Sequence, residues 1–227
     1  MLKTTRFLFL AKYDQQWYRN FYGRYLTAFV MIGLVLVNVL FFICQILYGD
    51  LLTDKGALDT YSVYSKDEWY RLITATFLHA DISHIISNMV GLFFLGGLIE
   101  ISVGHLGFAL IYLLSGIGGN AVSVLYEKTF MIDRYSVGAS GGVYGLIGAV
   151  LVLSIYERIR QKSEGESKGT TGNLVYRGAF VVIFMVASGF SEQNINNAAH
   201  IGGLVIGMLV SFILVLILRK KIKPMDL

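Results

Sequence analysis

The chain has 227 residues, of which 55% are hydrophobic and 15% are charged, and its mean hydropathy is +0.62. Soluble domains carry about 25% charged residues, so this composition argues against a soluble protein and indicates a polytopic membrane protein. The net charge of +4 does not indicate nucleic-acid binding, because the basic residues lie in short segments between apolar runs and not on one surface.

Six segments contain the roughly 20 mostly apolar residues that a membrane-spanning helix needs. In chain order they cover about residues 26–48, 82–103, 106–126, 138–156, 174–190 and 196–218. The predicted fold is therefore an all-α bundle of six transmembrane helices. We divide the chain into a basic N-terminal segment (1–24), a six-helix domain (25–218) and a basic tail (219–227).

The basic residues predict the orientation. They collect in the N-terminal segment, in the connection 157–177 and in the tail, which all fall on one side of a six-span protein. The positive-inside rule makes that side cytoplasmic. We therefore expect a multi-pass protein with both termini in the cytoplasm. Its compact form favours a bacterial plasma membrane, and an oligomer is not required.

Polar side chains inside spans are costly, so each is a functional candidate. His84 and Asn88 in the second span, Ser140 in the fourth and His200 in the sixth are expected at similar depth, because these spans enter from the same side. His84 and Asn88 are four residues apart and share one helix face. Both can donate hydrogen bonds toward one point, as an oxyanion-stabilising pair does.

Glycine seams predict which spans touch. Ser140 and Tyr144 share one face of the fourth span, and His200, Gly203 and Gly207 form one stripe on the sixth. The seam of the fourth span consists of Gly141, Gly145 and Gly148. Small residues allow close helix packing, which would bring His200 near Ser140. A serine within reach of a histidine is a nucleophile and its base.

The sequence lacks the residues that a catalytic triad, a zinc protease or an aspartate-dependent protease would need within the spans. Neither the fourth nor the sixth span has an acidic residue near His200, so the site would be a dyad. No His-Glu-x-x-His motif and no aspartate pair lies within the spans, which leaves no zinc site and no carboxyl dyad. Taken singly, Ser140 could be a packing residue, His200 an interior hydrogen-bonded histidine, and His84 and Asn88 polar contacts between helices.

Four sequence elements resemble the rhomboid intramembrane serine proteases, and they occur in that family's order over about residues 30–218. They are Trp69-Tyr-Arg71, Phe77-Leu-His79 with His84-Ile-Ile-Ser-Asn88, Gly138-Ala-Ser140-Gly141, and Ala199-His200-Ile-Gly-Gly203-Leu-Val-Ile-Gly207. One departure is visible, since a tyrosine separates Trp69 from Arg71 where the family has a Trp-Arg pair.

The resemblance implies a six-helix rhomboid bundle and a role for each matching residue. Ser140 would be the nucleophile and His200 the general base. His84, Asn88 and the Ser140 backbone N–H would form the oxyanion hole, and Tyr144 would stack beside His200. The supporting residues would be Gly138, Gly141, Gly203, Gly207, His79 and Arg71, with Glu100 as a structural anchor. His105 is expected to be an interfacial residue without a catalytic role.

The resemblance also implies transmembrane proteins of the lipid bilayer as substrates, a gate at the fifth span and a lid at 191–195. It implies no metal, no organic cofactor and no nucleic acid. The alternative is a non-catalytic rhomboid-like binder or chaperone of membrane helices. Such relatives lose the serine or the histidine, and this chain has both. A transporter would instead predict charged pairs or broken helices near the membrane midplane.

Overall fold

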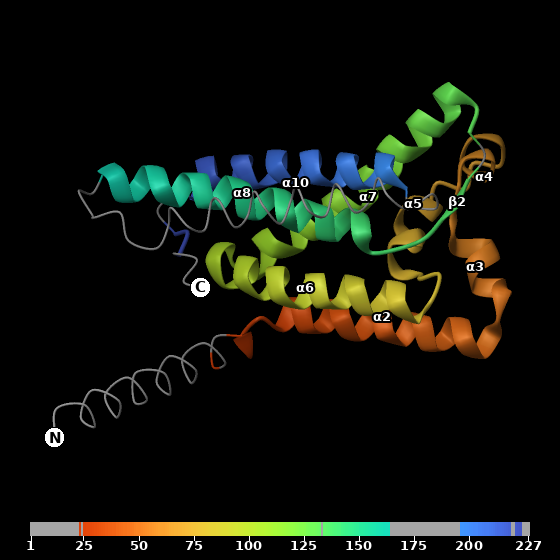
Figure 1. The fold of residues 1–227 in the computed structure, drawn as a ribbon, viewed down its shortest axis with the longest axis horizontal. Helices are drawn as coiled ribbons and strands as arrows, with labels where there is room; N and C mark the ends of the chain where they lie inside the picture. Colours follow the sequence, from red (N-terminus) through yellow and green to blue (C-terminus); the bar gives the residue numbers. More distant parts are fainter. Residues whose placement is uncertain (1–22, 24, 133, 164–195, 219–220, 224–227) are drawn as a thin grey trace, which may run out of the picture.

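The structure is a computed structural model and describes residues 23, 25–132, 134–163, 196–218 and 221–223. Five long helices form a bundle (Figure 1): α2 (Phe29–Tyr48), α6 (Ile82–Val103), α7 (His105–Phe130), α8 (Ser140–Ser163) and α10 (Asn197–Leu218). Each is long and apolar enough to cross a membrane. The all-α polytopic fold is thus confirmed. The predicted span at 174–190 and the predicted lid at 191–195 lie outside the described residues, so the count of six spans stays a prediction.

Two helices run further than their apolar segments. The predictions ended at 126 and 156, whereas α7 ends at Phe130 and α8 ends at Ser163. Apolar length measures where lipid ends, while a helix continues until its backbone finds another partner. In the extra turns of α8, Glu157 pairs with Arg160 at 2.8 Å. The start of α8 also differs, because Gly138 precedes the helix in a loop, with φ of 139°.

The connection 49–80 is folded rather than irregular. It contains α3 (Asp50–Gly56), β1 (Leu58–Asp59), α4 (Thr60–Ser65), α5 (Arg71–Thr74) and the 3-10 helix η1 (Ala75–Phe77). Strand β2 (Tyr135–Ser136) pairs antiparallel with β1, with Leu58 opposite Ser136. These elements lie at the end of the bundle where α6, α8 and α10 begin, which we name the Ser140 end (Figure 1).

Arg71 holds the connection together from a buried position. Its Nη1 donates to the carbonyl oxygens of Asp54 (2.9 Å) and Ala57 (2.7 Å), and its Nε donates to the carboxylate of Glu68 (2.6 Å). Hydrogen bonds from a charged donor to carbonyls 14 and 17 residues away fix the path of the chain. The geometry is that of a structural residue, despite the extra tyrosine beside Trp69.

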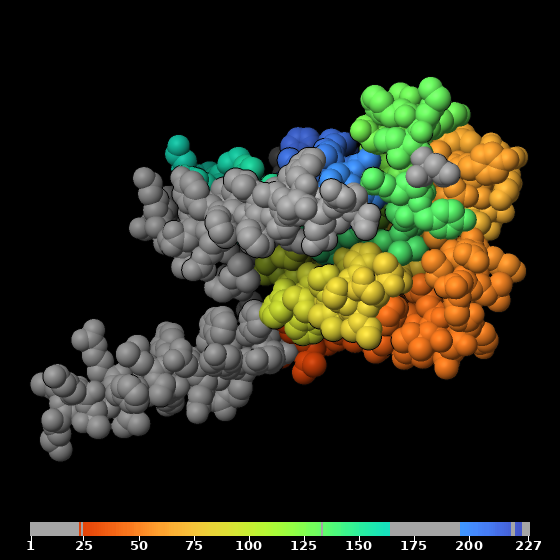
Figure 2. Space-filling view, turned by 45° about the vertical axis from the view of Figure 1, so that its right-hand side comes forward, coloured from red at the N-terminus to blue at the C-terminus, as the bar shows by residue number. Residues whose placement is uncertain are grey.

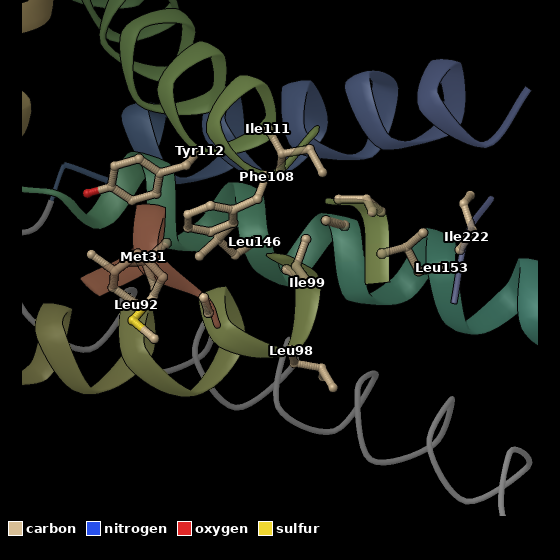
Figure 3. Packing of buried hydrophobic residues seen from close by; sticks show 14 of the residues in the cluster. Met31, Leu92, Leu98, Ile99, Phe108, Ile111, Tyr112, Leu146, Leu153 and Ile222 are labelled. Atoms are coloured by element: carbon tan, nitrogen blue, oxygen red, sulfur yellow. The ribbon is translucent and has the colours of Figure 1, made fainter. Parts of the chain in front are cut away.

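The core lies between α2, α6, α7 and α8. Figure 3 shows Met31, Leu92, Phe108 and Leu146 pointing toward one another from these four helices, and all are fully buried. The outer side of α6 is apolar as well, and in Figure 2 this helix (yellow) reaches the surface of the bundle. Its exposed large residues are Ile82, Ile86, Val90, Phe93 and Phe94. Apolar side chains inside and outside are typical of a helix that faces lipid.

The opposite end of the bundle is closed by Glu100. Helix α2 has no side-chain cap of its own, and the buried Glu100 carboxylate of α6 accepts hydrogen bonds from the backbone N–H groups of Val30 (3.0 Å) and Met31 (2.7 Å). A carboxylate at a helix N-terminus satisfies unpaired donors and complements the helix dipole. His105 Nδ1 lies 2.6 Å from the same carboxylate, at the end of the bundle opposite Ser140 (Figure 1).

Part of the predicted basic tail packs back onto the bundle. Ile222 is buried in the core cluster, Lys223 N–H donates to the carbonyl of Ser102 (3.0 Å), and Arg160 Nη1 donates to the carbonyl of Ile222 (3.2 Å). Residues 221–223 therefore join the last turns of α6 and α8.

Candidate active site

Ser140 and His200 meet at the Ser140 end of the bundle. Ser140 is the first residue of α8, and His200 lies in the first turn of α10. The distance from His200 Nε2 to Ser140 Oγ is 2.8 Å, which is a hydrogen bond whose direction depends on the tautomer of the ring. The approach predicted from the glycine seams is therefore present, with His200 nearly buried.

The close approach of α10 to α8 requires glycine. A Cβ added to Gly203 would collide with the carbonyl oxygen of Gly141, and one added to Gly207 would collide with that of Gly145. On the other side of α10, a Cβ at Gly119 of α7 would lie 2.6 Å from the Ala199 carbonyl oxygen. Backbone rather than side chains thus sets the separation of the helices, which fixes His200 relative to Ser140.

Tyr144 orients the histidine. Its ring stacks on His200 with 4.1 Å between the ring centroids and 13° between the planes, which is the contact that the resemblance implied. His200 Nδ1 is buried and has no hydrogen-bond partner among the described residues. Within the described part of the chain the ring is held by stacking and by Ser140, without an acidic third member.

His84 of α6 and Gly138, in the loop before α8, lie beside the serine. A Cβ at Gly138 would lie 2.8 Å from His84 Nε2 and 3.5 Å from Ser140 Oγ, so the three residues border one small space. Asn88 Nδ2 is buried and has no hydrogen-bond partner among the described residues. A buried amide donor without a partner can bind an oxygen of a ligand. Asp81 fixes the start of α6 by accepting a hydrogen bond from His84 N–H (2.8 Å).

The turn before α6 is clamped by a residue that the sequence reasoning missed. Gln45 near the end of α2 accepts a hydrogen bond from His79 N–H (3.0 Å) and donates one to the His79 carbonyl (3.1 Å). The His79 ring packs edge-on against His84, with centroids 5.3 Å apart. Burial lowers the pKa of His79 to about 4, so its ring is neutral at neutral pH. A polar Gln45 within the first apolar run was the available signal.

The fold and site define a class: a polytopic helical membrane protein with a serine–histidine pair inside its bundle. The rhomboid domain model matches residues 66–217, which is most of the chain, and the chain belongs to the rhomboid family.

Named relatives agree with this assignment. RHOMBOID-like protein 1 of Arabidopsis thaliana is 33% identical over 165 residues, covering 71% of this chain and 39% of that protein. Rhomboid-like protein 11, chloroplastic, of the same plant is 31% identical over 199 residues, covering 78% and 65%. Rhomboid protease GluP of Bacillus subtilis (strain 168) is 33% identical over 185 residues, covering 79% and 33%. The matches thus span between 33% and 65% of the length of these three relatives.

Proposed function

We propose that this protein is an intramembrane serine endopeptidase that hydrolyses peptide bonds in or near transmembrane segments of other membrane proteins. The observation that carries the proposal is the 2.8 Å contact between Ser140 Oγ and His200 Nε2 within a bundle of membrane-spanning helices. Membership of a family that includes a relative named as a rhomboid protease supports it.

In the proposed reaction His200 Nε2 removes the proton of Ser140 while Oγ attacks the carbonyl carbon of the substrate. The C–N bond then breaks, His200 gives the proton to the leaving amine, and an ester to Ser140 remains. His200 next removes a proton from water while the water oxygen attacks the ester carbon. The bond from that carbon to Ser140 Oγ then breaks, the acid fragment leaves, and His200 returns the proton to Oγ. Tyr144 keeps the imidazole plane fixed through both halves of the reaction.

The negative oxygen of each tetrahedral intermediate needs hydrogen-bond donors. We assign Asn88 Nδ2, the His84 ring and the Ser140 backbone N–H to this task. The buried, unpartnered amide of Asn88 supports the assignment, because among the described residues nothing competes for its protons. A single such donor contributes about 10²- to 10³-fold in rate.

The position of the site suggests which substrates can react. A peptide bond in a spanning helix is shielded by the helix hydrogen bonds, so a segment must unwind before its carbonyl can reach Ser140. We therefore infer a preference for transmembrane segments with residues that weaken a helix. From the basic segments near both termini we infer that the Ser140 end faces the non-cytoplasmic side, and we propose a bacterial plasma membrane as the location.

The test uses purified full-length protein in liposomes with a model transmembrane substrate. We expect two fragments to form, and a fluorophosphonate probe to label the parent protein but not Ser140→Ala. Equal cleavage by parent and Ser140→Ala contradicts the proposal. Binding of the substrate without cleavage or labelling would favour the alternative, a non-catalytic binder or chaperone of membrane helices.

Gly138→Ala is expected to lower the cleavage rate about 10²-fold, the size of losing an oxyanion donor. Its Cβ would lie 2.8 Å from the His84 ring, in the space beside Ser140. Gly104→Ala is the matched control, since Gly104 also has positive φ (84°) but has open space around its Cβ position. Cleavage by Gly138→Ala at the rate of Gly104→Ala would show that backbone strain, not intrusion into the site, is responsible for any loss.

A further inference from the structure

Five polar side chains from different parts of the chain meet just before α10. Asn196 Nδ2 donates to Ser123 Oγ (2.7 Å) and to Ser136 Oγ (2.9 Å). The carboxylate of Glu127 accepts from Ser123 Oγ (2.9 Å) and from Thr60 Oγ1 (2.6 Å). Four of the five residues are buried, and Ser136 is partly buried. We name this group the Asn196 network; it joins α4, α7, β2 and α10.

The network links the two chain segments that deliver the serine and the histidine. Asn196 lies four residues before His200, and its carbonyl accepts the His200 N–H (3.2 Å). Ser136 lies four residues before Ser140, at the end of β2. The 2.9 Å hydrogen bond between Asn196 and Ser136 therefore ties the approach to α10 to the approach to α8. Figure 1 shows β2 and α4 at the same end of the bundle as the start of α10.

An amide at position 196 is the side chain that these contacts require. Its Oδ1 accepts a hydrogen bond from Ala199 N–H (3.1 Å), which caps the first turn of α10, so the opposite atom must be the nitrogen. That nitrogen donates to the hydroxyls of Ser123 and Ser136 and lies 3.5 Å from a carboxylate oxygen of Glu127. An aspartate would keep the cap, lose both donors and bring a second carboxylate close to Glu127.

Glu127 anchors the network from α7. It is buried, and its contacts among the described residues are hydroxyls and an amide rather than a cation. Two of these contacts reach outside α7, to Thr60 of α4 and to Asn196. The carboxylate thus fixes Asn196 against the folded connection 49–80, which lies beside the candidate active site.

We infer that Asn196 and Glu127 are positioning residues that set the distance and angle between Ser140 and His200. The inference rests on the proposed peptidase function. Because neither residue touches the reacting atoms, loss of the network is expected to reduce turnover at each active site and to leave substrate binding unchanged. A purely structural role would instead reduce the amount of folded protein and leave the turnover of the remaining sites intact.

The experiment compares Asn196→Asp, Glu127→Gln and the double variant in full-length protein. In the double variant the amide of residue 127 can donate to the carboxylate of residue 196, which restores a donor–acceptor pair of reversed polarity. Fluorophosphonate labelling at its end point counts active sites, and kcat per labelled site and KM are measured with a transmembrane peptide substrate. We expect Asn196→Asp to lower kcat per site about ten-fold with KM within about two-fold, and the double variant to recover most of that loss.

Ser136→Ala is a milder variant, since it deletes one hydrogen bond at a partly buried position. We expect it to lower kcat per site about five-fold, the size of one hydrogen bond. Ser211→Ala is its control, because Ser211 is buried in α10 and its hydroxyl has no hydrogen-bond partner among the described residues.

An active parent in which Asn196→Asp and Ser136→Ala both keep the parental kcat per site overturns the inference. Failure of the double variant to recover, with its labelled fraction intact, also counts against it. A parent that neither cleaves nor reacts at Ser140 overturns the proposed function itself, so the two failures are distinguishable.

Discussion

His200→Ala is expected to lower kcat/KM for a transmembrane substrate by about 10⁴-fold or more. Removal of the base from a serine hydrolase site costs about 10⁴- to 10⁶-fold, and the remaining rate comes from oxyanion stabilisation and binding. Here His200 Nε2 is 2.8 Å from Ser140 Oγ, and no other described side chain forms a hydrogen bond with that oxygen. The measurement is cleavage by purified protein, together with the rate of fluorophosphonate labelling, which should fall in parallel.

His105→Ala is the matched control for this prediction. It removes the same side chain at the opposite end of the bundle, where the ring is about half exposed beside Glu100. We expect its cleavage rate per folded molecule to stay within about two-fold of the parent. If His200→Ala kept more than about a hundredth of the parental rate, another group would have to act as base, and the dyad assignment would be wrong.

The sequence was sufficient to predict the described spanning helices and the meeting of α8 with α10. Apolar length and helical period are local properties, so they can be read without knowledge of the fold. The seams were also readable: small residues at 141, 145, 203 and 207 allow a backbone approach that larger residues forbid. That approach brings His200 to Ser140, and i,i+4 spacing brings Tyr144 to the same place.

The sequence did not predict the contacts that hold the site from outside. The clamp between Gln45 and His79 joins residues 34 apart, and the bond between Ser136 and Asn196 joins residues 60 apart. Such pairs follow from tertiary packing and leave no periodic pattern in the chain. The folded connection 49–80 was not predicted for a related reason. Its helices have only three to seven residues, and the buried Arg71 of α5 holds the end of α3 by hydrogen bonds that the sequence pattern does not reveal.

Gly203→Ala, which alters the glycine seam between α8 and α10, is expected to lower both the cleavage rate and the stability. The new Cβ would collide with the backbone oxygen of Gly141, which cannot move as a side chain does, so α10 has to shift away from α8. A displacement of about 1 Å at reacting groups costs about 10²-fold in rate, and overpacking costs about 1–3 kcal/mol of stability. We expect both losses, measured as cleavage rate and as thermal denaturation, and larger ones in Gly203→Val.

Gly33→Ala is the control, because Gly33 lies in α2 with nothing within 4 Å of its Cβ position. There the added methyl group favours the helix and should leave cleavage unchanged. Parental activity in both Gly203 variants would mean that α10 can move without separating His200 from Ser140. In that case the orientation of the ring would have to come from Tyr144 and from the Asn196 network, and not from the seam.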